Sequence, residues 1–185
     1  DQSAVFLDSE VFGEFTVRNI EPVLHEPVPL KAREAASPTL CAMAMTGSGT
    51  LDRYRGQIDE AMRDKGSAIV DGIVADNGIE RCAAIVEESV EMEGSTLLEK
   101  QLSATIMYLC GIPGRRSRKL LETVVGLLGS TNRYVVQYMV MAIWLLAHDD
   151  ENKKLLGDLW AVDGLVKVAK ANSNIKLKEY IVSTL

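Results

Sequence analysis

The feature that most constrains the fold of this chain is a spacing of apolar residues that occurs three times. The three copies begin at Leu98, Val135 and Leu177, and each has apolar residues four and eight positions later. A small residue stands seven positions after each start, at Thr105, Ala142 and Thr184. This spacing places the apolar side chains on one stripe of a helix, with the small residue where two helices cross closely. The sequence therefore predicts three equivalent helices that pack through the same stripe.

A second internal repeat links pairs of short helical segments. Residues 67–79 align without a gap on residues 153–165, a shift of 86 residues. Each copy has the pattern of a short helix, an Asn-Gly or Asp-Gly turn that permits positive φ, and the start of another helix. The stripes are separated by 37 and 42 residues (135 − 98 and 177 − 135), and 86 residues make about two such periods. This period predicts an all-α fold, in which an α-solenoid of about three repeats occupies residues 51–185.

The motifs after residue 134 resemble those of a known family. A V-x-x-x-M-x-x-A-I helix ends at Leu146–Ala147, the acidic segment Asp149–Leu156 follows, and a Gly-Leu-Val motif comes next at Gly164–Val166. In this order they resemble the third, first and second helices of armadillo repeats, and the resemblance covers about residues 66–185. It implies a right-handed, armadillo-like solenoid, with a HEAT-type solenoid as the alternative.

The resemblance does not extend to every unit or to a known binding motif. The middle unit, Ile112–Val125, is too short for separate first and second helices, so we expect one loop and one helix there. Nuclear-import receptors of armadillo type hold their peptide with Asn residues on the third helix beside Trp. Tyr108 and Leu145 stand at the nearby positions here, so recognition of import signals is not implied.

Residues 1–50 differ from the rest of the chain. Three prolines between residues 22 and 29 interrupt helix formation, and the Ser37–Pro38 pair adds a further break. We expect an extended N-terminal arm that lies on a neighbouring surface, with a disordered tail as the alternative. Leu51–Lys65 has the pattern of a polar amphipathic helix that precedes the repeats.

The charge balance and the scarcity of His and Cys disfavour several classes of function. The net charge is −6: residues 1–92 contain 8 Lys/Arg and 17 Asp/Glu (−9), whereas residues 93–185 contain 12 and 9 (+3). An acidic chain of this kind disfavours nucleic-acid binding. Two His and three dispersed Cys provide no catalytic base beside a nucleophile, no zinc site and no disulfide framework. No apolar run approaches the length of about 18 residues that a membrane span needs. We therefore expect a non-enzymatic, intracellular protein in a reducing compartment, without cofactor, small-molecule substrate or membrane span.

One dense basic cluster is a candidate contact for a partner. Arg115, Arg116, Arg118 and Lys119 follow a Pro-Gly pair, which places them on an exposed loop that enters a helix. The cluster is either a solvated loop or a contact for an acidic protein or anionic surface.

Aromatic residues on the repeat helices are the other candidates. Tyr138, Trp144 and Trp160 lie on or near the predicted helices, and we expect both Trp residues to belong to the core. If Trp144 and Trp160 are exposed on the concave face instead, they are the best anchors for a protein partner, and we also name Tyr138 with Trp144 as candidate partner-binding residues.

The sequence favours a protein-interaction or scaffold module, docked as an accessory subunit in a larger assembly through its solenoid surface and its arm. The armadillo resemblance also allows a chaperone cofactor, such as an Hsp70 exchange factor or a solenoid that grips a client. A regulatory domain of a larger protein is the remaining alternative.

Overall fold

The computed structural model describes residues 29–48, 68, 70–74, 77–91, 96–112 and 117–185. Every regular element in these ranges is a helix, and no strand occurs in them, so the all-α prediction is confirmed for this part of the chain. The elements are α3 (Leu30–Gly47), α6 (Gly78–Glu91), α7 (Thr96–Cys110), α8 (Arg118–Gly126), the 3-10 turn η1 (Leu127–Gly129), α9 (Arg133–Leu146), α10 (Asp150–Asp158), α11 (Ala161–Ala171) and α12 (Ile175–Thr184).

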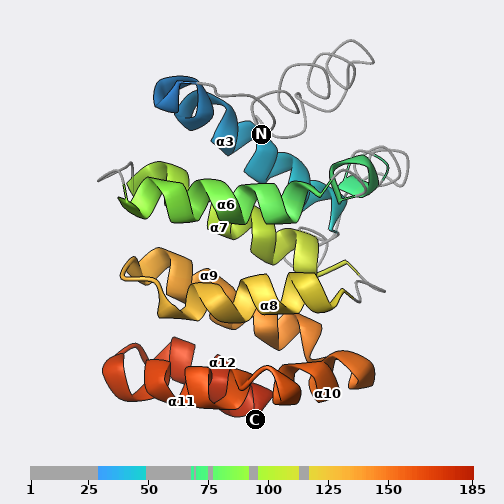
Figure 1. Cartoon of the computed structure of the whole chain (residues 1–185), viewed down its shortest axis with the longest axis vertical. Coiled ribbons are helices and arrows are strands. Elements are labelled where there is room, and N and C mark those ends of the chain that lie inside the picture. Colours follow the sequence, from blue (N-terminus) through green and yellow to red (C-terminus); the bar gives the residue numbers. More distant parts are fainter. Residues whose placement is uncertain (1–28, 49–67, 69, 75–76, 92–95, 113–116) are drawn as a thin grey trace.

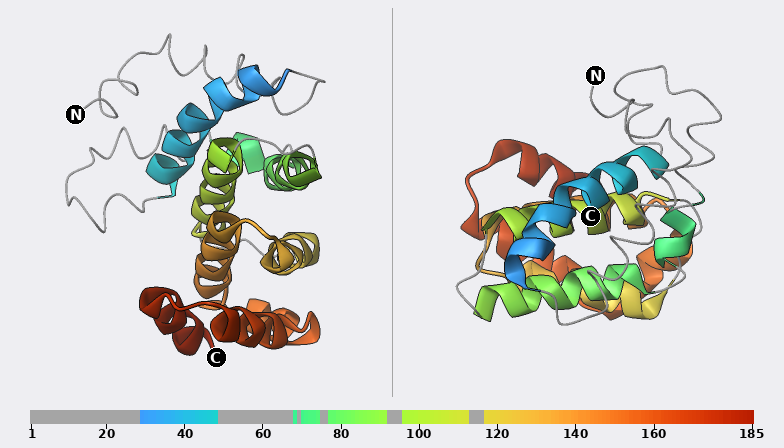
Figure 2. Two further views of the ribbon diagram at one scale, coloured as in Figure 1. Left: turned by 90° about the vertical axis from the view of Figure 1, so that its left-hand side faces the viewer. Right: turned by 90° about the horizontal axis from the view of Figure 1, so that it is seen from above.

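The described helices form two columns (Figure 1). One column consists of α6, α8 and the α10–α11 pair, and the other of α7, α9 and α12, as the side view in Figure 2 shows. α7 packs against α6 and α9, and α9 packs against α8 and α12, so each layer contacts the next. α3 packs across α7 at the N-terminal end of the stack. This layered arrangement is compatible with helical repeats.

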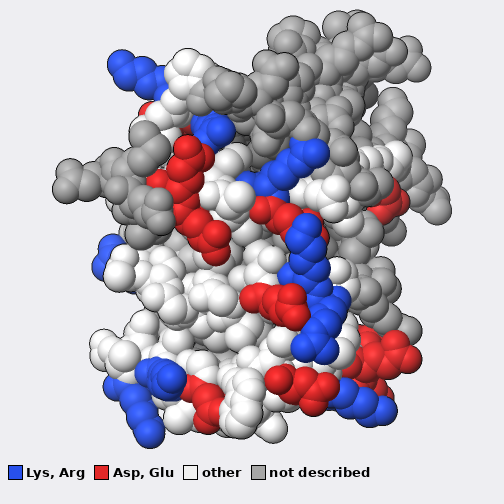
Figure 3. All heavy atoms as spheres, viewed as in Figure 1, with Lys and Arg blue, Asp and Glu red and all other residues white. Residues whose placement is uncertain are grey.

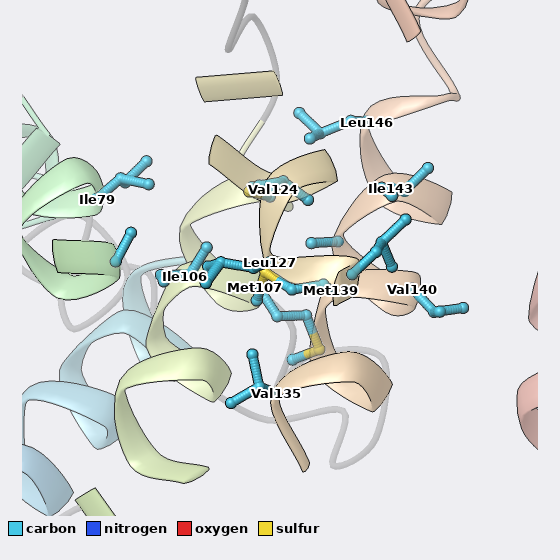
Figure 4. Close-up of a cluster of buried hydrophobic side chains, with 14 of the residues drawn as sticks. Ile79, Ile106, Met107, Val124, Leu127, Val135, Met139, Val140, Ile143 and Leu146 are labelled. Atoms are coloured by element: carbon cyan, nitrogen blue, oxygen red, sulfur yellow. The ribbon is translucent and has the colours of Figure 1, made fainter. Parts of the chain in front are cut away.

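The apolar stripe forms the centre of the core. The three residues that begin the stripe are at most 2% exposed, and so are the three residues four positions later. Eight positions after the start, Ile106 and Ile143 are fully buried, whereas Leu185 is exposed. Figure 4 shows Ile106 of α7 and Met139 of α9 in the same cluster of buried side chains. The predicted stripe is therefore confirmed for α7 and α9, and for α12 except at its last residue.

Polar side chains fix the residues at which several helices begin. Asp149 Oδ1 accepts hydrogen bonds from the backbone N–H groups of Glu151 and Asn152, at 3.0 and 3.1 Å. Asn132 caps α9 and Asn174 caps α12 in the same way. Each cap satisfies backbone donors that have no partner inside the helix. The acidic segment that follows α9 therefore forms the N-terminus of α10.

The register of the second internal repeat differs from the ungapped alignment. Asn77 and Trp160 both have φ of 59°, and each directly precedes a helix, α6 at Gly78 and α11 at Ala161. The structural shift is therefore 83 residues (161 − 78) rather than 86. The turn expected at residues 163–164 is wrong, because these residues lie inside α11. The ungapped alignment matched apolar residues only. It did not show that the segment before the left-handed residue is three residues shorter in the second copy than in the first.

The expectation of an extended arm is wrong for residues 30–47, which form α3. Pro38 lies inside this helix and cannot donate to the carbonyl oxygen of Glu34. The hydroxyl of Ser37 donates to that oxygen instead, at 3.1 Å. Leu40 and Ala44 are at most 2% exposed, and α3 packs on α7, so burial of an apolar face outweighs the helix-breaking residues. Residues 1–28 and the helix expected at 51–65 lie outside the described residues.

Trp160 is not a core residue, contrary to expectation. Its side chain is 74% exposed, because it stands in the link between α10 and α11, where helical periodicity does not apply. Its backbone is in the left-handed region, which is unfavourable for a bulky side chain and tolerated by Asn.

Asn occupies the equivalent position in the first copy, at Asn77. Replacement of Trp160 by Asn should raise the free energy of unfolding by about 0.5–1 kcal/mol, because Asn tolerates the positive φ with less strain. Urea denaturation followed by circular dichroism measures this change. The matched control is Asn77→Ala, which should lower the free energy of unfolding by about 1 kcal/mol. A loss of stability in Trp160→Asn would show that contacts of the indole ring outweigh the backbone strain.

Candidate protein-interaction surface

Five of the six described Tyr and Trp residues lie on one column of helices, and Trp160 is the exception. All four described Tyr residues and Trp144 lie on α7, α9 or α12, and α9 contributes three of these five. On α9, six apolar or aromatic side chains are half-buried; they are Tyr134, Val136, Tyr138, Met141, Trp144 and Leu145. We call five of them, all except Val136, the α9 face.

The α9 face lies on a different side of the helix from the buried stripe. Tyr134, Tyr138, Met141 and Leu145 follow the spacing i, i+4, i+7 and i+11, so they share one side of the helix. The fully buried stripe begins at Val135 and lies on another side. α9 is thus apolar around most of its circumference, with one side packed in the core and another only partly covered.

Trp144 is held in place by two edge-to-face ring contacts. Its ring lies 4.8 Å from the His148 ring at 89°, and 5.3 Å from the Tyr180 ring of α12 at 70°. His148 Nδ1 lies 2.8 Å from the carbonyl oxygen of Trp144, and it must donate because a carbonyl oxygen only accepts. Aromatic pairs of this geometry stabilise a fixed ring orientation. Trp144 is therefore half-buried rather than part of the core.

Two cations lie at the N-terminal end of the α9 face. Lys100 Nζ lies 5.2 Å, and Arg133 Cζ 4.8 Å, from the centroid of the Tyr134 ring. Arg133 Nη2 donates a hydrogen bond to the Tyr134 hydroxyl at 3.0 Å. This hydrogen bond, together with the charges of Arg133 and Lys100, lowers the pKa of Tyr134. The N-terminal end of the α9 face is therefore positively charged and suited to binding an acidic group.

α3 borders the α9 face through Cys41. Burial raises the pKa of Tyr138, and the nearby Cys41 and Tyr134 raise it further. Burial also raises the pKa of Cys41, although a hydrogen bond with Thr105 and the charge of Lys100 partly offset this effect. A raised pKa leaves Cys41 mostly protonated at neutral pH, which disfavours a role as a nucleophile.

The remaining thiols are inside the core. Cys82 and Cys110 are at most 3% exposed, and they pack in the core as small apolar residues. Burial raises the pKa of Cys82 to about 12.

The two described residues of the basic cluster, Arg118 and Lys119, do not lie beside the α9 face. Arg118 and Lys119 are exposed at the start of α8, where Arg118 Nε pairs with Glu122 Oε1 at 2.8 Å. Arg115 and Arg116 lie outside the described residues. α8 belongs to the other column (Figure 2). On the side of the molecule that α8 faces, positive and negative side chains are interspersed (Figure 3).

In the ranges that the structure describes, no group of three or more His, Cys, Asp or Glu side chains is arranged to hold a metal ion. Among the described helices, none combines the length and apolar character needed to cross a bilayer.

The comparisons with known proteins bear on the fold and not on the function. No protein-family model and no curated protein matches this sequence. The chain is similar to the crystal structure of an engineered protein, with a TM-score of 0.64 and 16% sequence identity. The match covers 92% of this chain, which spans 60% of the engineered protein. A similarity at this level of identity shows a shared helical fold alone.

Sequence reasoning proposed Tyr138 and Trp144 as candidates, but it did not include the residues around them. Lys100, Arg133 and Tyr180 come from three helices, and only packing brings them to the same surface. The spacing of Tyr134, Tyr138, Met141 and Leu145 was a usable sequence signal, because it gives α9 a second apolar side.

Proposed function

We propose that this chain is a non-enzymatic protein-interaction module, built as an armadillo-like α-solenoid of about three repeats. The observation that supports this function best is the α9 face. A helix that is apolar around its circumference is normally covered on every side, whereas α9 leaves six apolar or aromatic side chains only half-buried. Partly exposed aromatic and Met side chains are typical of the centre of a protein interface.

The chemistry of the surface defines the partner. Tyr138, Met141 and Leu145 offer an apolar centre, and Trp144 is fixed by its ring contacts with Tyr180 and His148. Lys100 and Arg133 lie at one end and favour a carboxylate. The expected partner is a protein segment with apolar side chains followed by an acidic residue. In a larger assembly, this surface would dock the module as an accessory subunit.

Incorporation of a photo-crosslinking residue tests the proposal. The crosslinker at Tyr138 should capture one partner from the native cell extract, whereas the same crosslinker at Glu122, on the other column, should not. Once the partner is purified, Tyr138→Ala should weaken binding about 30-fold, the effect of losing an interface hot spot of about 2 kcal/mol. The control Glu122→Ala should leave the affinity unchanged. Equal capture from both positions, with equal affinity of both Ala variants, would contradict the proposed surface.

A further inference from the structure

Within the described part of the chain, the two cations at the N-terminal end of the α9 face have no acidic partner. Arg133 donates to the Tyr134 hydroxyl, Lys100 lies over the same ring, and neither forms an ion pair with a described carboxylate. Lys100 belongs to α7 and Arg133 to α9, so helix packing brings two like charges to one ring, where they repel each other. An acidic group bound between them would offset this repulsion and form charge-assisted hydrogen bonds.

The chain itself contains a segment with the chemistry that the α9 face requires. Residues 1–28, which lie outside the described residues, contain six Asp/Glu and one Arg, a net charge of −5, and all three Phe residues. Apolar residues precede a carboxylate twice in this segment, in Val5-Phe6-Leu7-Asp8 and in Val11-Phe12-Gly13-Glu14. Both match the pattern expected of the partner, which is a set of apolar side chains followed by an acidic residue.

Charge distinguishes this segment from the other long segment outside the described residues. Residues 49–67 contain four Asp/Glu and four Lys/Arg, so their net charge is zero. Electrostatic complementarity with Lys100 and Arg133 therefore favours residues 1–28.

The position of α3 allows residues 1–28 to reach the α9 face. α3 begins at Leu30 and borders the face through Cys41, which lies near Tyr138. The 22 residues from Asp8 to Leu30 (30 − 8) can span up to about 70 Å, whereas the 14 residues of α9 extend about 21 Å. Tethering over this length gives a local concentration on the order of 1 mM. At that concentration a motif with a dissociation constant of about 0.1 mM occupies the face about 90% of the time.

We propose that residues 1–28 bind the α9 face of the same chain and compete with the external partner. An Asp or Glu of the segment lies between Lys100 and Arg133, and a neighbouring Phe packs on Tyr138 and Met141. With the face about 90% occupied, the apparent affinity for the partner falls about tenfold. This inference rests on the proposed function, because both treat the α9 face as a binding surface.

Photo-crosslinking of the purified full chain, with no extract present, tests the intramolecular contact. A crosslinker at Tyr138 should form crosslinks within one chain to residues 1–28, which mass spectrometry of the digested protein maps. The same crosslinker at Glu122, on the other column, should form none with that segment. The proposal would be overturned if the crosslinker at Tyr138 did not reach residues 1–28. Crosslinked dimers in place of crosslinked monomers would also overturn it, since a second copy would then occupy the face.

Charge reversal provides the matched control. Replacement of Asp8, Glu10 and Glu14 by Lys should lower the yield of crosslinks to residues 1–28 at least about fivefold, because like charges then meet at the face. Lys100→Glu with Arg133→Glu should lower the yield as much, and the chain that carries all five substitutions should recover it. A yield that does not respond to any of these reversals would contradict the proposed contact.

Partner capture from the native extract separates this inference from the proposed function. With the crosslinker at Tyr138, the chain with Lys at positions 8, 10 and 14 should capture about tenfold more partner than the unreversed chain. Equal capture by both chains would overturn the competition and leave the proposed function intact. Crosslinks to residues 1–28 in the purified chain, with no partner captured even by the reversed chain, would contradict the proposed function and leave residues 1–28 as the occupant of the face.

Discussion

Replacement of Ile143 by Ala is expected to lower the free energy of unfolding by about 2–5 kcal/mol. Ile143 is fully buried in α9, eight positions after the start of the apolar stripe. The substitution removes apolar contacts and leaves a cavity between layers that close packing prevents the neighbours from filling completely. Urea denaturation measures the loss as a lower midpoint at an unchanged slope.

The chain contains a matched control for this prediction. Leu185 stands at the same stripe position of α12 but is 62% exposed, so Leu185→Ala should change the free energy of unfolding by no more than about 0.5 kcal/mol. The contrast reports the effect of burial, because Ile143 is enclosed inside α9 whereas Leu185 is the exposed C-cap residue of α12. Equal losses in the two variants would contradict the layered core that the structure describes.

Replacement of Asn132 by Ala is expected to lower the free energy of unfolding by about 2–4 kcal/mol, through the loss of two separate hydrogen bonds. Its Oδ1 accepts from the backbone N–H of Tyr134 at 2.8 Å and caps α9. Its Nδ2 donates to Oε2 of Glu99, a carboxylate on α7 that is only 5% exposed. The side chain thus joins the start of one stripe helix to the interior of the preceding one.

Two further variants separate these contributions in the same urea experiment. Asn132→Ser keeps a cap but has no amide, so it should lose only the part that belongs to Glu99, about 1–3 kcal/mol. In a Glu99→Gln background, Asn132→Ala should cost little more than a lost cap, about 1 kcal/mol, because no buried charge depends on the amide. A cost of Asn132→Ala that is the same in both backgrounds would mean that Glu99 does not depend on Asn132.

Local sequence patterns predicted the elements that depend on local physics. The stripe from Leu98 to Leu109 was recognisable because helical periodicity repeats every 3.6 residues whatever the neighbours are. The acidic segment that begins at Asp149 was also recognisable locally, since the cap hydrogen bonds of Asp149 go to residues two and three positions later. The prediction of a single helix in the middle unit depended on the short length of that unit. The unit has room for α8 but not for a second long helix.

Contacts between distant residues decided the features that the sequence did not reveal. α3 forms despite Pro38, because its apolar side is buried on α7 and Ser37 supplies the missing hydrogen bond. Arg33 Nη1 also pairs with Glu88 Oε2 of α6 at 2.9 Å, across 55 residues of sequence. These contributions do not appear in any local propensity, so the prolines misled the prediction for residues 30–47.

The features of the candidate surface also separate into those that the sequence predicted and those that helix packing decided. The sequence by itself determined that the chain is helical, that one stripe recurs on three helices, and which aromatic residues those helices contain. Only the tertiary structure decided that Trp160 is exposed and that Lys100 and Arg133 lie over Tyr134. The physical reason is that periodicity assigns a side chain to a side of its helix, whereas exposure depends on which neighbouring layer covers that side.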